Sequence, residues 1–203
     1  MNTLHRTLIS QAHRPRGLFG HLTGLRFAHR SSNRRRNRWV VALLDVRPTD
    51  RVLEVGFGPG VAIAELAGFA TEGHVVGIDH SAVMVRQARR RNAVAIRAGR
   101  VELHQASVAA LPSFTAPFDA VLAVNTVGMW PDPVGRLVEL RGLLRAGGRI
   151  ALVNQPRLPG ASTLGAAAEL RELLTKAGFV ELATSILPLD PAVACVRAIS
   201  SIR

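Results

Sequence analysis

The sequence predicts an α/β protein with a doubly wound, mostly parallel seven-stranded sheet and helices on both of its faces. Three observations predict it. Short apolar runs alternate with helical patterns from residue 50 onward, which indicates parallel strands joined by right-handed crossovers. The first run leads into a turn with three glycines at 56, 58 and 60. The last two apolar runs have no helix between them, which predicts an antiparallel last strand.

The strands and helices follow from apolar patterning and from turn residues. Five runs bounded by turns are too short for core helices and are predicted to be strands: 51–55, 74–78, 100–104, 118–124 and 149–153. Two more strands are expected within 177–199. Helices are expected at 60–70, 81–95, 132–145 and 164–177. For the third helix, Asp132 can cap the first turn, Pro133 suits the first helical position, and Gly147 with Gly148 can close the far end.

Residues 1–38 are predicted to form a basic N-terminal helical arm or lid, and residues 39–203 the globular domain. The first segment holds nine arginines and no acidic residue, and thus +9 of the net charge of +12. An arginine-rich, acid-free start is also typical of transit peptides. Trp39, Val40, Leu43 and Leu44 share one helical face that we expect to dock on the core.

Composition narrows the possible classes of protein. No run approaches the roughly 18 apolar residues that a membrane-spanning helix needs, and we expect a soluble, cytoplasmic protein. Cys195 is the single cysteine and leaves no metal-ligand pattern, so no metal is predicted. The histidines at 5, 13, 21 and 29 recur every eight residues and therefore share no helical face.

The glycine turn and Asp79 together predict a nucleoside site. Glycine lets the backbone turn tightly and approach a ligand closely, at the start of a helix whose N–H groups attract anions. A dinucleotide-binding turn would need its third glycine at position 61, where Val61 stands. Asp79 ends the next strand, 23 residues after Gly56, where a carboxylate can accept hydrogen bonds from ribose hydroxyls.

Five segments then resemble, in order, those of the class I S-adenosylmethionine-dependent methyltransferases, which have a Rossmann-like fold. They are VLEVGFGPG, GIDHSAVMVRQAR, VELHQASVAALP, FDAVLAVNTVGMWPDP and LLRAGGRIALV, and they span about residues 50–155. The resemblance implies a methyltransferase with S-adenosylmethionine as its cofactor. It does not extend to residues 1–38.

The resemblance also implies which residues hold the cofactor. Glu54 and the glycine turn would contact the methionine part, and Asp79 the ribose. Where relatives have Gly-Asp-Ala in the third segment, this chain has Ala-Ser-Val, so Ser107 would reach the adenine without a charge. The implied set is Glu54, Gly56, Gly58, Gly60, Asp79, His80, Met84, Ser107 and Asn125, with His80 and Met84 beside the adenine.

No catalytic dyad is expected, because a sulfonium leaving group departs neutral and alignment of two bound reactants can supply about 7 to 11 kcal/mol. The catalytic residues therefore remain unassigned. Candidates on the acceptor side follow the fourth strand. Asn125 could orient the nucleophile or the sulfonium end. Trp130 could form an apolar or cation-attracting wall, or pack over the next helix.

The acceptor is predicted to be a small molecule, of a lipid-like or amine kind. The loop after Asn125 lacks the Pro-Pro-aromatic motif of nucleobase amino-methylases, and it has no acidic pair between Asp119 and Asp132 for arginine methylation. The absence of tyrosine and 4% aromatic content give poor base stacking, so nucleic acid is not favoured as a partner.

One alternative is an RNA-binding or RNA-modifying methyltransferase that uses the basic arm. A nicotinamide-dependent reductase is disfavoured by the glycine spacing. The sequence leaves the acceptor, the methylated atom and the oligomeric state open.

Overall fold

The computed structural model describes residues 31–201, and the helical pattern expected before residue 31 lies outside this range. The elements follow in the order α3 (Ser31–Leu43), β1 (Arg51–Val55), α4 (Val61–Phe69), β2 (His74–Asp79), α5 (Ala82–Arg91), α6 (Ala93–Arg97), β3 (Val101–Gln105), β4 (Phe118–Val124), the 3-10 turn η1 (Val127–Met129), α7 (Pro133–Leu143), β5 (Leu144–Asn154), α8 (Thr163–Lys176), β6 (Phe179–Leu187) and β7 (Val193–Ser200). None of these helices is both long and apolar enough to cross a membrane.

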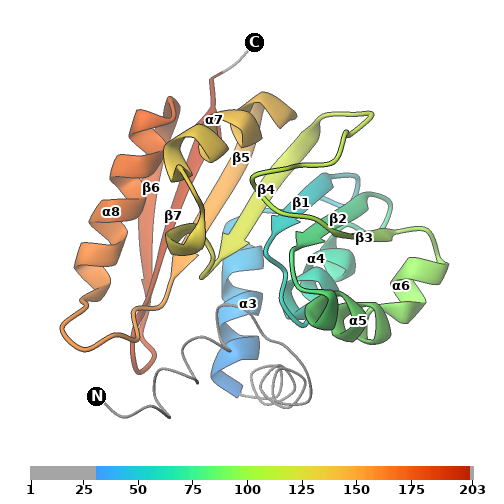
Figure 1. The fold of residues 1–203 in the computed structure, drawn as a ribbon, viewed down its shortest axis with the longest axis horizontal. Helices are drawn as coiled ribbons and strands as arrows, with labels where there is room; N and C mark the ends of the chain where they lie inside the picture. The colour runs from blue at the N-terminus through green and yellow to red at the C-terminus, as the bar shows by residue number, and fades with distance from the viewer. Residues whose placement is uncertain (1–30, 202–203) are drawn as a thin grey trace.

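The seven strands form one sheet in the order β3-β2-β1-β4-β5-β7-β6 (Figure 1). Strands β1 to β5 pair in parallel, whereas β7 lies between β5 and β6 and is antiparallel to both. The predicted fold class, including the antiparallel last strand, is confirmed. The strand order reverses between β1 and β4, and ligands of open α/β sheets bind beyond the carboxyl ends of the strands at such a point.

Two apolar clusters, one on each face, hold the sheet between helices. Successive residues of a strand point to opposite faces, so Val52 belongs to the cluster under α3, α4 and α5, and Leu53 to the cluster under α7 and α8. Both residues are completely buried. The alternation along β1 therefore explains why helices are required on both faces.

Helix α3 is part of this packing, although it begins within the predicted basic arm. It crosses residue 38 without a break and contacts α4. Val40 and Val41 of α3 are buried, as is Leu44 just after its end, and Arg197 of β7 donates a hydrogen bond to the Leu43 carbonyl at 2.9 Å. Residues 31–38 thus pack with the domain, while residues 1–30 lie outside the described range.

Two predicted helix boundaries differ in the structure. The helix expected at 81–95 is divided at Asn92, because the Asn92 amide bonds the carbonyls of Ala88 and Gly60 at 2.9 and 3.1 Å. Such side-chain bonds compete with helix continuation. At α7, Asp132 caps the first turn through the Gly135 N–H as predicted. The expected closure by Gly147 and Gly148 is wrong, because the helix ends at Leu143 and both glycines lie within β5.

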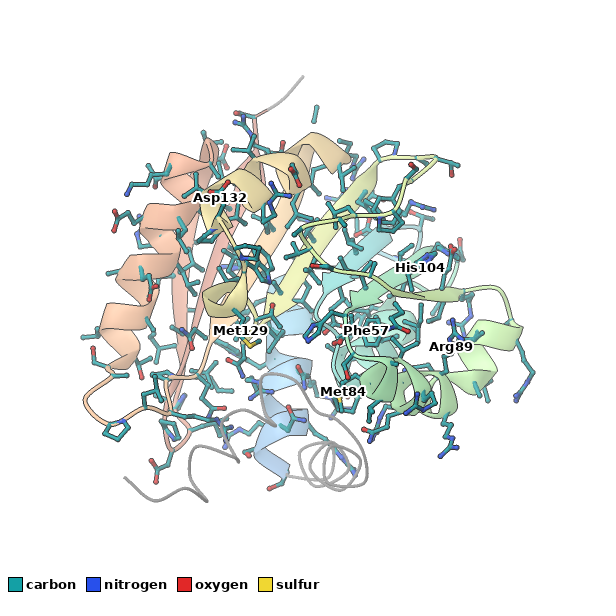
Figure 2. The ribbon with its side chains drawn as sticks, in the orientation of Figure 1. Phe57, Met84, Arg89, His104, Met129 and Asp132 are labelled. Atoms are coloured by element: carbon teal, nitrogen blue, oxygen red, sulfur yellow. The ribbon has the colours of Figure 1, made fainter. Side chains whose placement is uncertain are left out.

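Strand β3 forms one edge of the sheet, and a side chain covers part of it. The Arg100 carbonyl and the Ala106 N–H bond toward β2, so the alternating Leu103 carbonyl points to the open edge. The Arg89 guanidinium donates to that carbonyl at 3.1 Å. Figure 2 shows Arg89 reaching from α5 toward this edge.

Candidate functional site

Polar side chains collect at the carboxyl ends of four neighbouring strands. Glu54 is the penultimate residue of β1 and Asp79 the last of β2, while Asn125 follows β4 and Gln155 follows β5. Carboxyl ends of parallel strands meet at one edge of the sheet, and this edge includes the point where the strand order reverses. The topology therefore brings together residues that lie 101 positions apart in the sequence.

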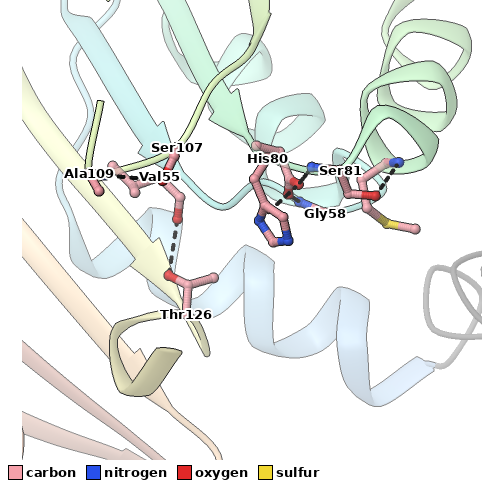
Figure 3. Close-up of polar contacts among 9 residues, drawn as sticks. Val55, Gly58, His80, Ser81, Ser107, Ala109 and Thr126 are labelled. Carbon is pink, nitrogen blue, oxygen red and sulfur yellow. Dashed lines mark hydrogen bonds and ion pairs between the residues drawn. The ribbon is translucent and has the colours of Figure 1, made fainter. Parts of the chain in front are cut away.

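Asp79 holds the glycine turn in place. Its Oδ2 accepts a hydrogen bond from the Gly58 N–H and its Oδ1 one from the Ser81 N–H, both at 2.8 Å (Figure 3). Burial raises the pKa of Asp79, while these two hydrogen bonds and the charge of His80 act in the opposite direction. Each carboxylate oxygen retains a second lone pair, so the group can still accept from a ligand.

The three glycines of the turn serve different purposes. A Cβ at Gly56 would lie 2.4 Å from Cγ2 of Thr126, and a Cβ at Gly60 would lie 2.7 Å from Cβ of Ala88, so these two positions admit no larger residue. A Cβ at Gly58 would meet nothing within 4 Å. Gly58 has a φ of 53°, which a non-glycine residue adopts only with strain. The turn is thus packed at both ends and open in its middle.

Glu54 is buried without full hydrogen bonding. It is 2% exposed, and its Oε2 has no hydrogen-bond partner among the described residues. Burial, and next the charge of Asp79, raises the pKa of Glu54 well above its usual value, against the opposing effects of Arg36 and of a backbone hydrogen bond from Ile63. An unpaired buried carboxyl group is costly, so a ligand donor at this place would be favoured.

The residues expected beside the adenine differ in exposure. The His80 side chain is 50% exposed, with Nδ1 3.9 Å from Oδ1 of Asp79. Met84 is 7% exposed, and its N–H donates to the Ser81 hydroxyl at 3.4 Å. The Ser107 hydroxyl accepts from the Ala109 N–H at 3.2 Å (Figure 3), which fixes its oxygen within its own turn and leaves its O–H as a donor.

The predicted acceptor-side residues have distinct surroundings. Asn125 has a φ of 57°, which asparagine tolerates better than most residues, and its Oδ1 accepts from the Gln155 N–H at 2.8 Å. Trp130 is 9% exposed within the apolar cluster that contains Leu137, as packing over the next helix requires. Met129 is 42% exposed, and Figure 2 shows it near the tip of β4.

Three functional candidates were missed from the sequence: Arg36, Gln155 and Arg157. Arg36 donates through Nη1 to Oε1 of Gln155 at 2.9 Å, and Arg157 donates through Nη2 to the same oxygen at 2.8 Å. Burial, and next the charge of Arg157, lowers the pKa of Arg36 to about 10. One signal was available, because Asn33, Arg36 and Asn37 precede Val40 at the spacing of a single helical face.

Cys195 is not placed for covalent chemistry. It lies in β7, on the antiparallel side of the sheet, and is completely buried. Burial raises the pKa of its thiol to about 12. Because the thiolate is the nucleophilic form, this cysteine is inert at neutral pH.

Comparison with known proteins links this architecture to methyl transfer. A family model described as "Methyltransferase domain" matches residues 52–148. The uncharacterized methyltransferase YdaC of Bacillus subtilis is 32% identical over 65% of this chain and 71% of its own. The trans-aconitate 2-methyltransferase of Azoarcus sp. is 36% identical over 66% of this chain. This chain spans about half of that enzyme, 49% of its length.

A solved structure shares the fold over nearly the whole chain. The magnesium protoporphyrin IX methyltransferase of Synechocystis PCC 6803, determined with bound S-adenosylmethionine, superposes with a TM-score of 0.66. The match covers 98% of this chain and 93% of that one at 20% identity. At this level of identity, the similarity establishes the fold.

Proposed function

The chain belongs to the class I S-adenosylmethionine-dependent methyltransferases, and we propose that it methylates a small molecule at the carboxyl ends of β4 and β5. The acceptor would lie beyond Asn125 and Gln155, next to the first half of α3. The cofactor would lie beside it, over the glycine turn and the ends of β1 and β2. The reaction would take place between these two halves of one sheet edge.

The described residues fit the cofactor in charge and in space. The open middle of the turn at Gly58 would admit the cofactor, and the remaining lone pairs of Asp79 would accept from the ribose hydroxyls. The unpartnered Oε2 of Glu54 would accept from the amino group of the methionine part. Gly56 and Gly60 would shape the turn through their packing.

The remaining cofactor residues have secondary roles in this proposal. His80 and Met84 would contact the adenine, and Ser107 would offer it one uncharged O–H donor, since its oxygen accepts from the Ala109 N–H. Asn125 would act through its amide N–H group, because its oxygen is engaged by Gln155. Adenine recognition would then depend mainly on contact with apolar and half-exposed side chains.

Catalysis would consist mainly of alignment. The bound cofactor supplies an electrophilic methyl carbon on a sulfonium. The residues of the chain would hold the acceptor atom in line with that carbon and keep water away, which can supply most of the required rate enhancement. The α3 side chains near Gln155 and the loop after β4 would form the walls of this region.

The burial of Trp130 is the observation that carries the choice of a small-molecule acceptor. Proteins that bind single-stranded nucleic acid stack bases on exposed aromatic rings, whereas the aromatic residue of the β4 loop is 9% exposed. The exposed Met129 would instead offer an apolar contact to a lipid-like part of the acceptor. The name of the Azoarcus relative, which gives trans-aconitate as its acceptor, also supports a small molecule.

The first test is calorimetric titration of the purified protein with S-adenosylhomocysteine, with NADH as the control. We expect micromolar binding of the first compound and none of the second. Binding of NADH alone would contradict the assignment of the glycine turn.

The acceptor class is tested by a transfer assay with methyl-labelled cofactor. Small-molecule extracts and total RNA are offered separately. We expect label in the small-molecule fraction. Label in RNA alone would replace the proposal with the RNA-modifying alternative.

A further inference from the structure

We propose that Arg36 and Arg157 form a carboxylate-binding site at the carboxyl end of β5. This inference rests on the proposed function only for the position of the site, between the cofactor and the acceptor. The site would recognise either the carboxylate of the methionine part of the cofactor or a carboxylate of the acceptor. Both sources present the same planar, singly charged group.

Two guanidinium groups converge on one neutral oxygen. Arg36 of α3 and Arg157 of the loop after β5 both donate to Oε1 of Gln155, at 2.9 and 2.8 Å. Gln155 is itself fixed, because its Nε2 donates to the Pro191 carbonyl at 2.7 Å. Like charges brought together near a rigid neutral group favour the binding of an anion between them.

The charge of Arg36 is only weakly compensated by the described residues that act on it. Arg36 is 8% exposed and its Nη2 donates to the neutral Oδ1 of Asn33. The acidic group that acts on Arg36 is Glu54, which burial and the charge of Asp79 favour in its neutral form. The buried guanidinium therefore lacks a fully charged counter-ion among the described residues that act on it.

The orphaned atoms of Arg36 and Glu54 have complementary chemistry. Nε of Arg36 and Oε2 of Glu54 are both buried and have no hydrogen-bond partner among the described residues. A donor and an acceptor in one electrostatically linked group suit a zwitterion, with its ammonium at Glu54 and its carboxylate at Arg36. A guanidinium fork matches a carboxylate better than an ammonium group of lysine would.

The decisive variant is Arg157→Gln. Arg157 is exposed, so its replacement leaves the buried contacts of α3 in place. Arg38→Gln is the matched control, because Arg38 lies on the same helix as Arg36 but its side chain is 80% exposed and pairs with Glu65. A third variant, Arg36→Lys, keeps the positive charge but loses the forked guanidinium. The melting temperature of each of the three variants shows whether it is folded.

The first arm of the experiment tests whether the bound carboxylate is that of the cofactor. Wild type and variants are titrated with S-adenosylhomocysteine and with 5′-methylthioadenosine, which lacks the amino-acid end. If the cofactor carboxylate binds here, Arg157→Gln and Arg36→Lys lower the affinity for S-adenosylhomocysteine by about tenfold to a hundredfold. They leave 5′-methylthioadenosine unchanged, and Arg38→Gln changes neither.

The second arm tests whether the bound carboxylate is that of the acceptor. Octanoate and benzoate are titrated beside octanamide and benzamide, with and without saturating S-adenosylhomocysteine. If an acceptor carboxylate binds here, wild type binds the acids but not the amides, and Arg157→Gln loses at least about tenfold in affinity for the acids. Arg38→Gln again retains wild-type affinity.

The proposal is overturned if the arginine variants change neither arm. That outcome differs from a failure of the proposed function, in which the wild type would bind neither S-adenosylhomocysteine nor 5′-methylthioadenosine. In that case the difference in affinity between acids and amides, measured in the wild type and in Arg157→Gln, would still test whether the arginine pair binds a carboxylate.

Discussion

The polar edge of the sheet, at the carboxyl ends of β2, β1, β4 and β5, has two halves that are built differently. At the ends of β1 and β2, the Asp79 carboxylate bonds backbone N–H groups 2 and 21 residues away. At the ends of β4 and β5, the central bond joins Arg36 to Gln155 across 119 residues. The first half depends on local backbone conformation, and the second on how distant elements dock.

This difference explains where specificity can vary in such a fold. A glycine turn locked by an aspartate presents the same polar surface whatever follows it in the sequence. The second half is assembled from a helix before β1 and from a loop after β5, so it can change without disturbing the first. The following predictions test this separation through affinity for S-adenosylhomocysteine, from the largest expected effect to the smallest.

Gly58→Val should have the largest effect. We expect the affinity for S-adenosylhomocysteine to fall by more than about a hundredfold, because the side chain fills the open middle of the turn and strains a residue with positive φ. The matched control is Gly99→Val, since Gly99 has a φ of 70° and open space around its Cβ. Both variants should lose about 1–2 kcal/mol of stability. Equal affinity losses in the two would show that strain alone is responsible.

Asp79→Asn should weaken binding by about 1–3 kcal/mol and should also lower the melting temperature. The amide can accept only one of the two backbone hydrogen bonds that the carboxylate accepts, and it places a donor against the other N–H. Asp119→Asn is the control, since Asp119 accepts from the Arg51 N–H at 2.6 Å. It should lower stability and leave affinity unchanged. An unaltered affinity in folded Asp79→Asn would move the ribose site elsewhere.

Glu54→Gln should weaken the binding of S-adenosylhomocysteine by about tenfold. It should also remove a pH dependence of the stability of the fold. Because burial raises the pKa of Glu54 in the folded protein, its neutral form stabilises the fold at low pH, and that contribution is lost as pH rises. The variant should therefore melt above the wild type by a margin that grows with pH.

Ligand binding at Glu54 should release a proton. A bound ammonium group favours the charged carboxylate, so the affinity of the wild type should increase as the pH rises above the ordinary titration range of a glutamate carboxyl group. Calorimetry in two buffers of different ionisation enthalpy measures the proton release. Glu172→Gln, on the exposed side of α8, should retain the release. Proton release that persists in Glu54→Gln would show that Glu54 is not the group that loses the proton.

Trp130→Phe should have the smallest effect on binding. Because Trp130 belongs to the same buried apolar cluster as Leu137, we expect a loss of about 1 kcal/mol in stability with unchanged affinity for S-adenosylhomocysteine. Met129→Ala, a change at an exposed side chain, should leave both unchanged. A loss of affinity in folded Trp130→Phe would revive its role as a wall of the site.

The sequence indicated the contact region of Gly58 and Asp79 in the first half but not the contact of Arg36 with Gln155 in the second, for a physical reason. Gly58 and Asp79 can be recognised because few residue types permit a positive φ or accept two backbone hydrogen bonds at a strand end. The pairing of Arg36 with Gln155 depends on tertiary docking, which leaves no local pattern. The break at Asn92 was missed for the same reason, since it requires the Gly60 carbonyl from another turn.

The contact of Arg89 with the Leu103 carbonyl also bears on the behaviour of the protein at high concentration. An open edge strand can add a strand from another molecule, which is a common route to aggregation. At β3 one outward carbonyl, that of Leu103, is occupied by the Arg89 guanidinium, so a strand that pairs at this position would have to displace a hydrogen bond and approach a positive charge. Arg89 therefore makes association through the middle of this edge less favourable.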